Sequence, residues 1–293
     1  MRLAAIDIGT NACRLLISEV IIHPKAEPQF NKLNLVRVPL RLGFDVFETG
    51  EISKPKKGMI LQTMKAYSHL MNAYRVDKHI AVATSAMRDA KNKNEVVRKI
   101  FLETGINIQI ISGDFEASLI YESHIAEHLN SNSNYLYIDV GGGSTEITFF
   151  SNNQLVYKRS FNIGTIRILK NMVQESDWDF MKEEIRENIK GIKNTMAIGT
   201  GGNINKVFSL SKKKDGKSLD INLLKDYYRE FSSCSVEDRI RNYNLREDRA
   251  DVIVPALLIY IQVMKWANID EILVPKIGLA DGLIQHLYAQ FSV

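Results

Sequence analysis

Two acidic residues flank a run of three glycines in the segment YLYIDVGGGSTEITFF, residues 135–150. Asp139 comes just before the run Gly141–Gly142–Gly143, and Glu146 comes just after it. Glycine weakens a strand interior, because it loses the most backbone entropy on folding and offers no side chain to pack. The run therefore predicts a turn with positive φ whose N–H groups converge on an anion, and phosphate is the main candidate. The alternative is a glycine-rich hairpin whose acids are merely solvated.

A second segment of the same shape stands at the start of the chain. LAAIDIGTNACRLLISEV, residues 3–20, also runs from an apolar strand through Asp7 and a turn of small residues to Arg14 and a second strand. The two aspartates lie 132 residues apart (139 − 7), a little under half of the chain. We therefore expect two similar domains, each contributing one phosphate loop, with a cleft between them.

Other polar residues follow apolar strands at positions suited to phosphate chemistry. ATSAMRDAKN places Thr84, Ser85 and Arg88 after a strand, and hydroxyl and guanidinium groups bind phosphate oxygens. ISGDFEASLIYES places Glu116 early in a helix, where it either complements the macrodipole or serves as a general base for water. IGTGGNINKV puts Gly201 at a strand-to-helix turn, which indicates either an anion site or simply a tight turn.

Composition narrows the class of protein. The 293 residues suggest about two domains, and a formal charge of +4 is well short of the strong basicity of nucleic-acid-binding proteins. Two cysteines without a CxxC motif predict free thiols in a reducing cytoplasm, and Cys13 is better read as a small buried residue than as a nucleophile. No signal peptide or membrane span is expected, because the longest apolar run, 252–264, is shorter than the roughly 20 residues a span requires.

Hydrophobic periodicity predicts alternating strands and helices. Strands are expected at residues 3–8, 14–20, 33–42, 79–84, 107–111, 135–140, 145–151, 154–162, 196–199 and 271–274. Helices are expected at residues 56–74, 94–103, 115–128, 165–173, 177–190, 202–209, 221–231, 246–267 and 279–291. The domains predicted from this pattern are 1–128 and 129–293, with the C-terminal helix 279–293 packing on the first.

The ordered set of motifs resembles the exopolyphosphatase and guanosine pentaphosphate phosphatase family, in its short two-domain form, within the actin-like ATPase superfamily. The motifs are AAIDIGTNACRLLI, ATSAMRDAKN, IISGDFEASLIY, IDVGGGSTEI, GTGGN, RADVIVPALL and IGLADGLI, and they span essentially the whole chain. The resemblance implies an α/β fold of two ribonuclease-H-like domains with mixed sheets flanked by helices. It also implies hydrolysis of a terminal phosphoanhydride in the cleft between these domains.

The resemblance also assigns roles to residues. Glu116 is implied as the general base, with Glu146 and Arg88 as further catalytic residues, and Asp7, Asp139 and Glu146 as the groups that bind the metal or orient water. The phosphate-binding residues carried over from the motifs are Thr10, Asn11, Arg14, Ser85, Gly141, Gly142, Gly143, Ser144, Thr145 and Gly201. Two positions depart from the family pattern: Ala12 replaces a serine of the first loop, and Ala280 stands where an arginine usually precedes Asp-Gly-Leu.

The expected function is that of an exopolyphosphatase releasing orthophosphate from inorganic polyphosphate, with Mg²⁺ or another divalent cation such as Mn²⁺. The alternatives are a phosphatase converting guanosine pentaphosphate to the tetraphosphate, an acceptor-dependent kinase, and a non-catalytic polyphosphate- or nucleotide-binding regulator. The expected partners are polyphosphate or guanosine pentaphosphate and a second copy in a homodimer, with no nucleic acid and no membrane.

A lysine-rich segment, SLSKKKDGKSLD at residues 209–220, is expected to be a mobile surface loop, whose lysines are either simply solvated or attract a polyanion by their field. If they steer polyphosphate, replacing Lys212, Lys213, Lys214 and Lys217 by glutamate raises KM for long polyphosphate at low salt and has little effect at high salt, where surface charges are screened. Steady-state kinetics at two ionic strengths test this, and an unchanged low-salt KM refutes steering.

Overall fold

The computed structural model describes residues 1–23, 27–122, 134–152, 154–189, 192, 194–275 and 277–291. The chain divides into two compact units, Met1–Ser123 with Gly278–Val293 (unit 1) and His124–Ile277 (unit 2). The predicted boundary at 128/129 lies outside the described residues and stays a prediction.

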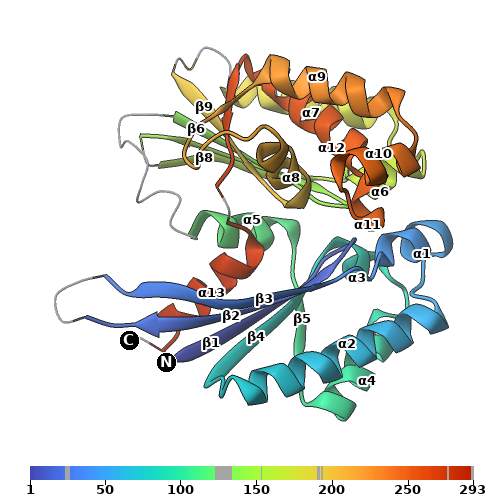
Figure 1. The fold of residues 1–293 in the computed structure, drawn as a ribbon, viewed down its shortest axis with the longest axis vertical. Helices are drawn as coiled ribbons and strands as arrows, with labels where there is room; N and C mark the ends of the chain where they lie inside the picture. The colour runs from blue at the N-terminus through green and yellow to red at the C-terminus, as the bar shows by residue number, and fades with distance from the viewer. Residues whose placement is uncertain are drawn as a thin grey trace. The chain divides into compact units, whose positions relative to one another are not determined.

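Unit 1 is built on a five-stranded sheet with the order β3-β2-β1-β4-β5 (Figure 1). Strands β1, β2 and β3 form an antiparallel meander, whereas β4 and β5 run parallel to β1. The strands are β1 (Arg2–Ile8), β2 (Cys13–Ile21), β3 (Gln29–Val38), β4 (Lys78–Ala83) and β5 (Ile108–Ile110).

Helices cover both faces of this sheet. They are α1 (Leu42–Thr49), α2 (Lys54–Ala73), α3 (Ser85–Asp89), α4 (Lys93–Thr104), α5 (Gly113–Glu122) and α13 (Leu279–Ala289). In Figure 1, α2 and α4 lie beside each other along the sheet. On one face, Leu3, Leu16 and Val82 pack with Leu119 of α5 and Leu283 of α13 in a buried apolar cluster. Alternation along the strands sends their other residues to the opposite face.

Unit 2 repeats the strand order of unit 1. Its sheet has the order β10-β11-β9-β6-β7-β8, in which β6, β7 and β8 form the antiparallel meander and β9 and β11 run parallel to β6. The strands are β6 (Asn134–Val140), β7 (Thr145–Ser151), β8 (Gln154–Phe161), β9 (Thr195–Thr200), β10 (Leu219–Asp220) and β11 (Glu271–Leu273). The α/β class with two mixed sheets flanked by helices is thus confirmed.

The helices of unit 2 surround one large apolar core. They are α6 (Thr165–Leu169), α7 (Glu175–Ile189), α8 (Gly202–Leu210), α9 (Ile221–Ser233), α10 (Val236–Tyr243), α11 (Glu247–Ala250) and α12 (Ile253–Ala267). Helix α12 is the central one, since Leu257, Tyr260 and Met264 are buried in that core. Within the described residues, the stretch Glu247–Ala267 has the length and apolarity of a membrane span, but 61% of its most apolar window is buried inside the structure. Such burial is typical of a core helix.

Three helices were not predicted from the sequence. The strand expected at 33–42 ends at Val38, and α1 begins at Leu42 after Arg41, which has a left-handed φ of 52°. Helix α3 lies within the ATSAMRDAKN segment, where only polar residues after a strand were noted. Helix α10 begins after Ser235, whose side chain accepts a hydrogen bond from Asp238 N–H. Short polar helices carry little hydrophobic periodicity, so their capping residues are the better signal.

Gly282 of α13 allows α13 to lie directly against α5. A Cβ at this position would lie 1.8 Å from the carbonyl oxygen of Leu119, a backbone atom that no rotamer change can move away. Gly282→Ala is therefore expected to destabilise the protein by about 3 kcal/mol or more. Thermal and denaturant unfolding test this. The control is Gly58→Ala in α2, where a Cβ meets nothing within 4 Å; it is expected to stabilise by up to about 1 kcal/mol.

Candidate active site

The two predicted phosphate loops, one in each unit, have the same hydrogen-bonded turn. Loop 1 (residues 9–12) joins β1 to β2, and loop 2 (residues 141–144) joins β6 to β7. Gly9 N–H donates to the Ala12 carbonyl at 3.0 Å, and Gly141 N–H donates to the Ser144 carbonyl at 2.9 Å. Each loop is therefore a hairpin turn, which for loop 2 is the alternative interpretation of the sequence. The acids next to the loops are not merely solvated, because Asp7, Asp139 and Glu146 accept hydrogen bonds.

The carbonyl groups of both loops are held by a helix N-terminus. In loop 2, Gly141 and Gly142 accept hydrogen bonds from the N–H groups of Thr165 and Ile166 at the start of α6, at 3.1 and 2.8 Å. In loop 1, Thr10 and Asn11 accept in the same way from Gly43 and Arg41 at the start of α1, at 3.0 and 2.9 Å.

The N–H groups of loop 2 remain available for an acceptor. Those of Gly142, Gly143 and Ser144 donate to no other group in the part of the chain that the structure describes. A turn whose carbonyls are held and whose N–H groups are not is suited to binding an anion.

The backbone of loop 2 has no positive φ at its glycines and lies close to Gly164. Among the described glycines, positive φ occurs at Gly50, Gly105, Gly201 and Gly216, so the expectation of positive φ within residues 141–143 is wrong. The close approach is to Gly164, where a Cβ would lie 2.5 Å from both the Gly142 carbonyl oxygen and the Gly143 carbonyl carbon. Arg167 of α6 adds a bond from Nε to the Gly143 carbonyl at 2.7 Å. Loop 2 is thus fixed against the segment that opens α6.

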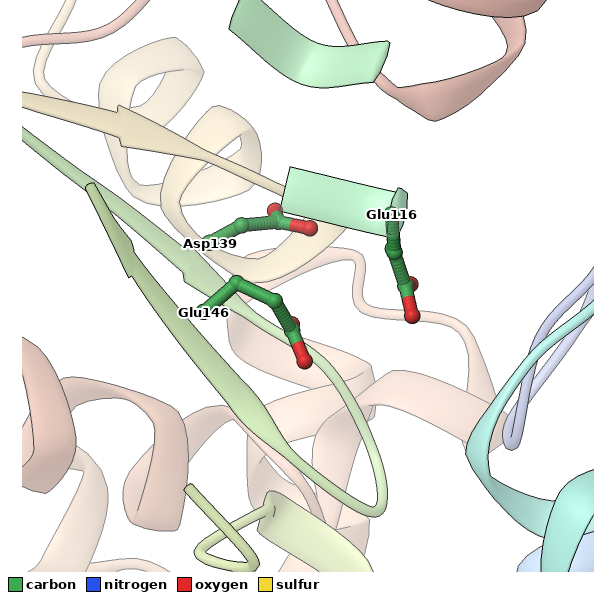
Figure 2. A group of neighbouring side chains, drawn as sticks. All are labelled: Glu116, Asp139 and Glu146. Carbon is green, nitrogen blue, oxygen red and sulfur yellow. The ribbon is translucent and has the colours of Figure 1, made fainter. Parts of the chain in front are cut away.

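Asp139 and Glu146 lie in a row of four polar residues that crosses four strands of unit 2. The register aligns Ser160 of β8 with Glu146 of β7, Glu146 with Asp139 of β6, and Asp139 with Thr200 of β9. Thr200 Oγ1 donates to Asp139 Oδ1 at 2.7 Å, and Ser160 Oγ donates to Glu146 Oε1 at 2.8 Å. We call these four residues the carboxylate row. Figure 2 shows the side chains of Asp139 and Glu146 extending from their neighbouring strands.

The carboxylate row has the chemistry of a divalent cation site. Two carboxylates directly opposite each other on adjacent strands repel and destabilise the sheet unless a positive charge is shared between them. Each carboxylate has one oxygen held by a hydroxyl group, and its second oxygen is the candidate ligand atom. Hard oxygen ligands of this type fit Mg²⁺ or Mn²⁺.

The corresponding row of unit 1 has different charges. There the register aligns Arg37 with Arg14, Arg14 with Asp7, and Asp7 with Val82. Arg14 Nη1 forms an ion pair with Asp7 Oδ2 at 2.7 Å. Asp7, predicted as a metal ligand, is therefore already paired with an arginine, and its role as a ligand stays a prediction. A row with one acid and two arginines is better suited to an anion than to a cation.

The segment after β4 contains residues predicted to bind phosphate. Thr10 Oγ1 of loop 1 accepts a hydrogen bond from Ala86 N–H at 3.2 Å, which ties that loop to α3. Ser85 is 2% exposed, and its Oγ has no hydrogen-bond partner among the described residues. Arg88 Nη1 donates to the Ile111 carbonyl at 2.8 Å, so one donor of this guanidinium holds the segment between β5 and α5.

Two predicted phosphate ligands have structural roles. The hydroxyl of Thr145 is buried and donates to the Ile163 carbonyl at 2.6 Å. Gly201 has a left-handed φ of 107°, and a Cβ there would lie 3.2 Å from Asp139 Oδ1. Gly201 thus keeps space open beside the carboxylate row.

Tyr260 of α12 supports the carboxylate row from the core. It is 1% exposed, and its hydroxyl donates to the backbone carbonyl of Thr200. Burial, followed by the charge of Asp139, raises the pKa of Tyr260 well above its usual value, so the hydroxyl stays protonated and remains a donor. Sequence reasoning missed these roles of Ser160, Thr200 and Tyr260. Thr200 lies in the GTGGN motif, but its contact with Asp139, like that of Ser160 with Glu146, follows only from the strand register. The contact of Tyr260 follows only from the packing of α12.

Glu116 lies in the first turns of α5 in unit 1. Ser112 starts this helix by accepting hydrogen bonds from Phe115 N–H at its hydroxyl and from Glu116 N–H at its carbonyl. Glu116 is 8% exposed, whereas Asp114 of the same turn is exposed. Figure 2 labels Glu116 with Asp139 and Glu146, which belong to unit 2.

Cys13 has no sign of a nucleophilic role. Its thiol is buried, and burial, with a further contribution from the charge of Asp7, raises its pKa above the ordinary value. A protonated thiol is a poor nucleophile. The interpretation of Cys13 as a packing residue is therefore favoured.

Comparisons with known proteins agree on one family. Residues 21–291 match the family model described as Ppx/GppA phosphatase family. The chain is 30% identical to a bifunctional 3-dehydroquinate synthase/phosphatase of Fusobacterium nucleatum over 93% of this chain, but it spans only 44% of that protein. It is 23% identical to exopolyphosphatase 1 of Mycobacterium tuberculosis, covering 97% of this chain and 87% of that protein.

A solved structure supports the same fold. The crystal structure of an exopolyphosphatase from Cytophaga hutchinsonii superposes with a TM-score of 0.83 at 24% identity, covering 99% of this chain and 97% of that one. The extent of the family match establishes that the chain belongs to the Ppx/GppA phosphatase family.

Proposed function

We propose that this protein is an exopolyphosphatase that hydrolyses the terminal phosphoanhydride bond of inorganic polyphosphate and releases orthophosphate. The observation that carries the proposal is the carboxylate row beside loop 2, because it combines a candidate cation site with N–H groups suited to phosphate oxygens. Family membership makes the chain a phosphoanhydride hydrolase, and the similarity to exopolyphosphatase 1 of Mycobacterium tuberculosis over most of both chains favours polyphosphate as the substrate.

Each group has a role in this reaction. The N–H groups of loop 2 bind equatorial oxygens of the terminal phosphoryl group, as do those of loop 1 together with Arg88. Asp139 and Glu146 would hold the divalent cation, which would supply neutralisation of charge on the phosphate oxygens. Both loops are fixed by helix N-termini before substrate binds, so little reorganisation is needed.

Glu116 is the proposed general base. It accepts a proton from a water molecule as the water oxygen bonds to the terminal phosphorus and the bond from that phosphorus to the bridging oxygen breaks. The bridging oxygen keeps the electron pair, and orthophosphate leaves. The buried position of Glu116 distinguishes it from its neighbour Asp114, which is exposed.

Several finer points are proposals of the same kind. We propose Mg²⁺, or Mn²⁺ in its place, as the cation, a homodimer as the assembly and the cytoplasm as the location. Binding of nucleic acid or membrane is not part of the proposal.

The role of Glu116 is tested by comparing Glu116→Gln with the matched variant Asp114→Asn. Phosphate release from polyphosphate with Mg²⁺ is expected to fall by about 10²- to 10⁴-fold in Glu116→Gln, because the base is lost. Asp114→Asn removes a charge from the same helical turn and is expected to stay within about twofold of the wild type, since only the macrodipole contribution changes. Equal activity of both variants would mean that the base is another residue.

The substrate is tested in the same assay. Polyphosphates of several lengths are compared with guanosine pentaphosphate, and release mainly from the nucleotide would favour the second function. ADP formed from ATP only with an acceptor would indicate a kinase. No release from any substrate would favour a binding protein.

The contribution of loop 2 to substrate binding is tested at Gly164. Gly164→Ala places a methyl group 2.5 Å from the backbone of Gly142 and Gly143, so the loop must move and its N–H groups with it. KM for polyphosphate is expected to rise by about tenfold, which corresponds to about 1.4 kcal/mol of lost binding. Gly278→Ala, where a Cβ meets nothing within 4 Å, is the control. Equal kinetics of the two variants would contradict the role of loop 2.

A further inference from the structure

Each proposed cation ligand is held by a hydroxyl group of the next strand outward. Thr200 is 1% exposed and donates to Oδ1 of Asp139. Ser160 donates to Oε1 of Glu146. In both pairs the two residues are register partners, so the distance between them is set by the sheet itself.

A hydrogen bond from a hydroxyl group to one carboxylate oxygen determines the direction in which the other oxygen can bind a cation. A carboxylate rotates about its terminal torsion, which has broad minima. A hydrogen bond to one oxygen fixes that torsion and directs the other oxygen to one side. It also occupies one lone pair of the first oxygen, which favours the second oxygen as the ligand atom of each acid.

Thr200 is itself held in place from the core. Tyr260 donates to the Thr200 carbonyl, and the hydroxyl of Tyr260 would lie 3.7 Å from a Cβ at Gly201. The connection therefore runs from helix α12 through β9 to the carboxylate on β6. A helix in the centre of the apolar core thus supports the geometry of the proposed cation site.

Comparison of the two units associates the hydroxyl groups of Thr200 and Ser160 with the proposed cation site. The position of Thr200 in unit 2 corresponds to Val82 in unit 1, since both face the aspartate of their row on the parallel neighbouring strand. In unit 1 the aspartate pairs with Arg14 and has no hydroxyl from that strand. Valine has nearly the shape of threonine without the hydroxyl, so Thr200→Val removes the hydrogen bond with little change of volume.

We propose that Thr200 and Ser160 are positioning residues that set the cation affinity of Asp139 and Glu146, with Tyr260 holding Thr200 in place. This rests on the cation site of the proposed function and extends it to three residues that act through the proposed ligands. Hydrogen-bonded partners of metal ligands commonly change metal affinity by about 10- to 100-fold when they are removed.

The test measures binding of Mn²⁺ alone, from the loss of the free-ion electron paramagnetic resonance signal, on the full chain. Thr200→Val and Ser160→Ala are each expected to weaken Mn²⁺ binding by about 10-fold or more. Thr200→Ser keeps the hydroxyl and is expected to remain within about threefold of the wild type. Tyr260→Phe is expected to give a smaller loss in the same direction, and it carries the test if Thr200→Val does not fold.

The matched control is Thr195→Val. Thr195 lies at the other end of β9, and its hydroxyl donates to a backbone carbonyl, that of Ile192. A general weakening of the strand would affect Thr195→Val and Thr200→Val alike, whereas a positioning role affects only Thr200→Val. The same variants in the phosphatase assay are expected to need more Mg²⁺ for half-maximal activity, with most of kcat recovered at saturating Mg²⁺.

Asp139→Asn separates this inference from the proposed function. If Asp139→Asn loses Mn²⁺ binding while Thr200→Val and Ser160→Ala both bind as tightly as the wild type, the positioning role is wrong and the cation site stands. If Asp139→Asn binds Mn²⁺ as the wild type does, the cation site is misassigned and the positioning role is wrong with it.

Discussion

The carboxylate row requires two negative charges to stand side by side on adjacent strands. Asp139 and Glu146 are register partners at the end of a hairpin, where repulsion between like charges opposes strand pairing. The surrounding structure offsets this cost locally, with a hydroxyl donor on each outer strand and helix N-termini holding the adjoining loop. The electrostatic cost and the proposed use of the row thus have the same origin, because a cation between the two acids would relieve their repulsion.

The two units share one topology but have different polar residues beside their hairpin turns. Both sheets share the strand order of a meander followed by parallel strands, and both turns close with the same hydrogen bond. The rows beside the turns differ, with two acids and two hydroxyls in unit 2 but one acid, two arginines and a valine in unit 1. Hydrolysis of a polyanion requires both a cation to neutralise charge and donors to hold oxygens. Under the proposed function, these tasks would be divided between the two rows.

The sequence predicted much of this arrangement, for identifiable reasons. The long strands and helices follow from periodicity, and the offset between Asp7 and Asp139 predicted the internal repeat that the two sheets confirm. Short elements such as α3 and α10 carry too little periodicity to be found that way. The expectation of positive φ in loop 2 failed because glycine has two uses. The close contact at loop 2 is made by Gly164, which has no Cβ to meet the backbone of Gly142 and Gly143, and only the fold shows this approach.

The supporting residues could not be predicted, because register is a property of pairing and not of local sequence. Ser160, Thr200 and Tyr260 lie 14, 54 and 114 residues after Glu146 in the chain, and no motif links them. Their function depends on which residue faces which across neighbouring strands, and a slip of one residue would turn every side chain of a strand to the other face. The hydrophobic core sets this register, since Leu136, Ile138 and Val140 of β6 are buried in it. The apolar residues that make the sheet fold therefore also decide which hydroxyl meets which carboxylate.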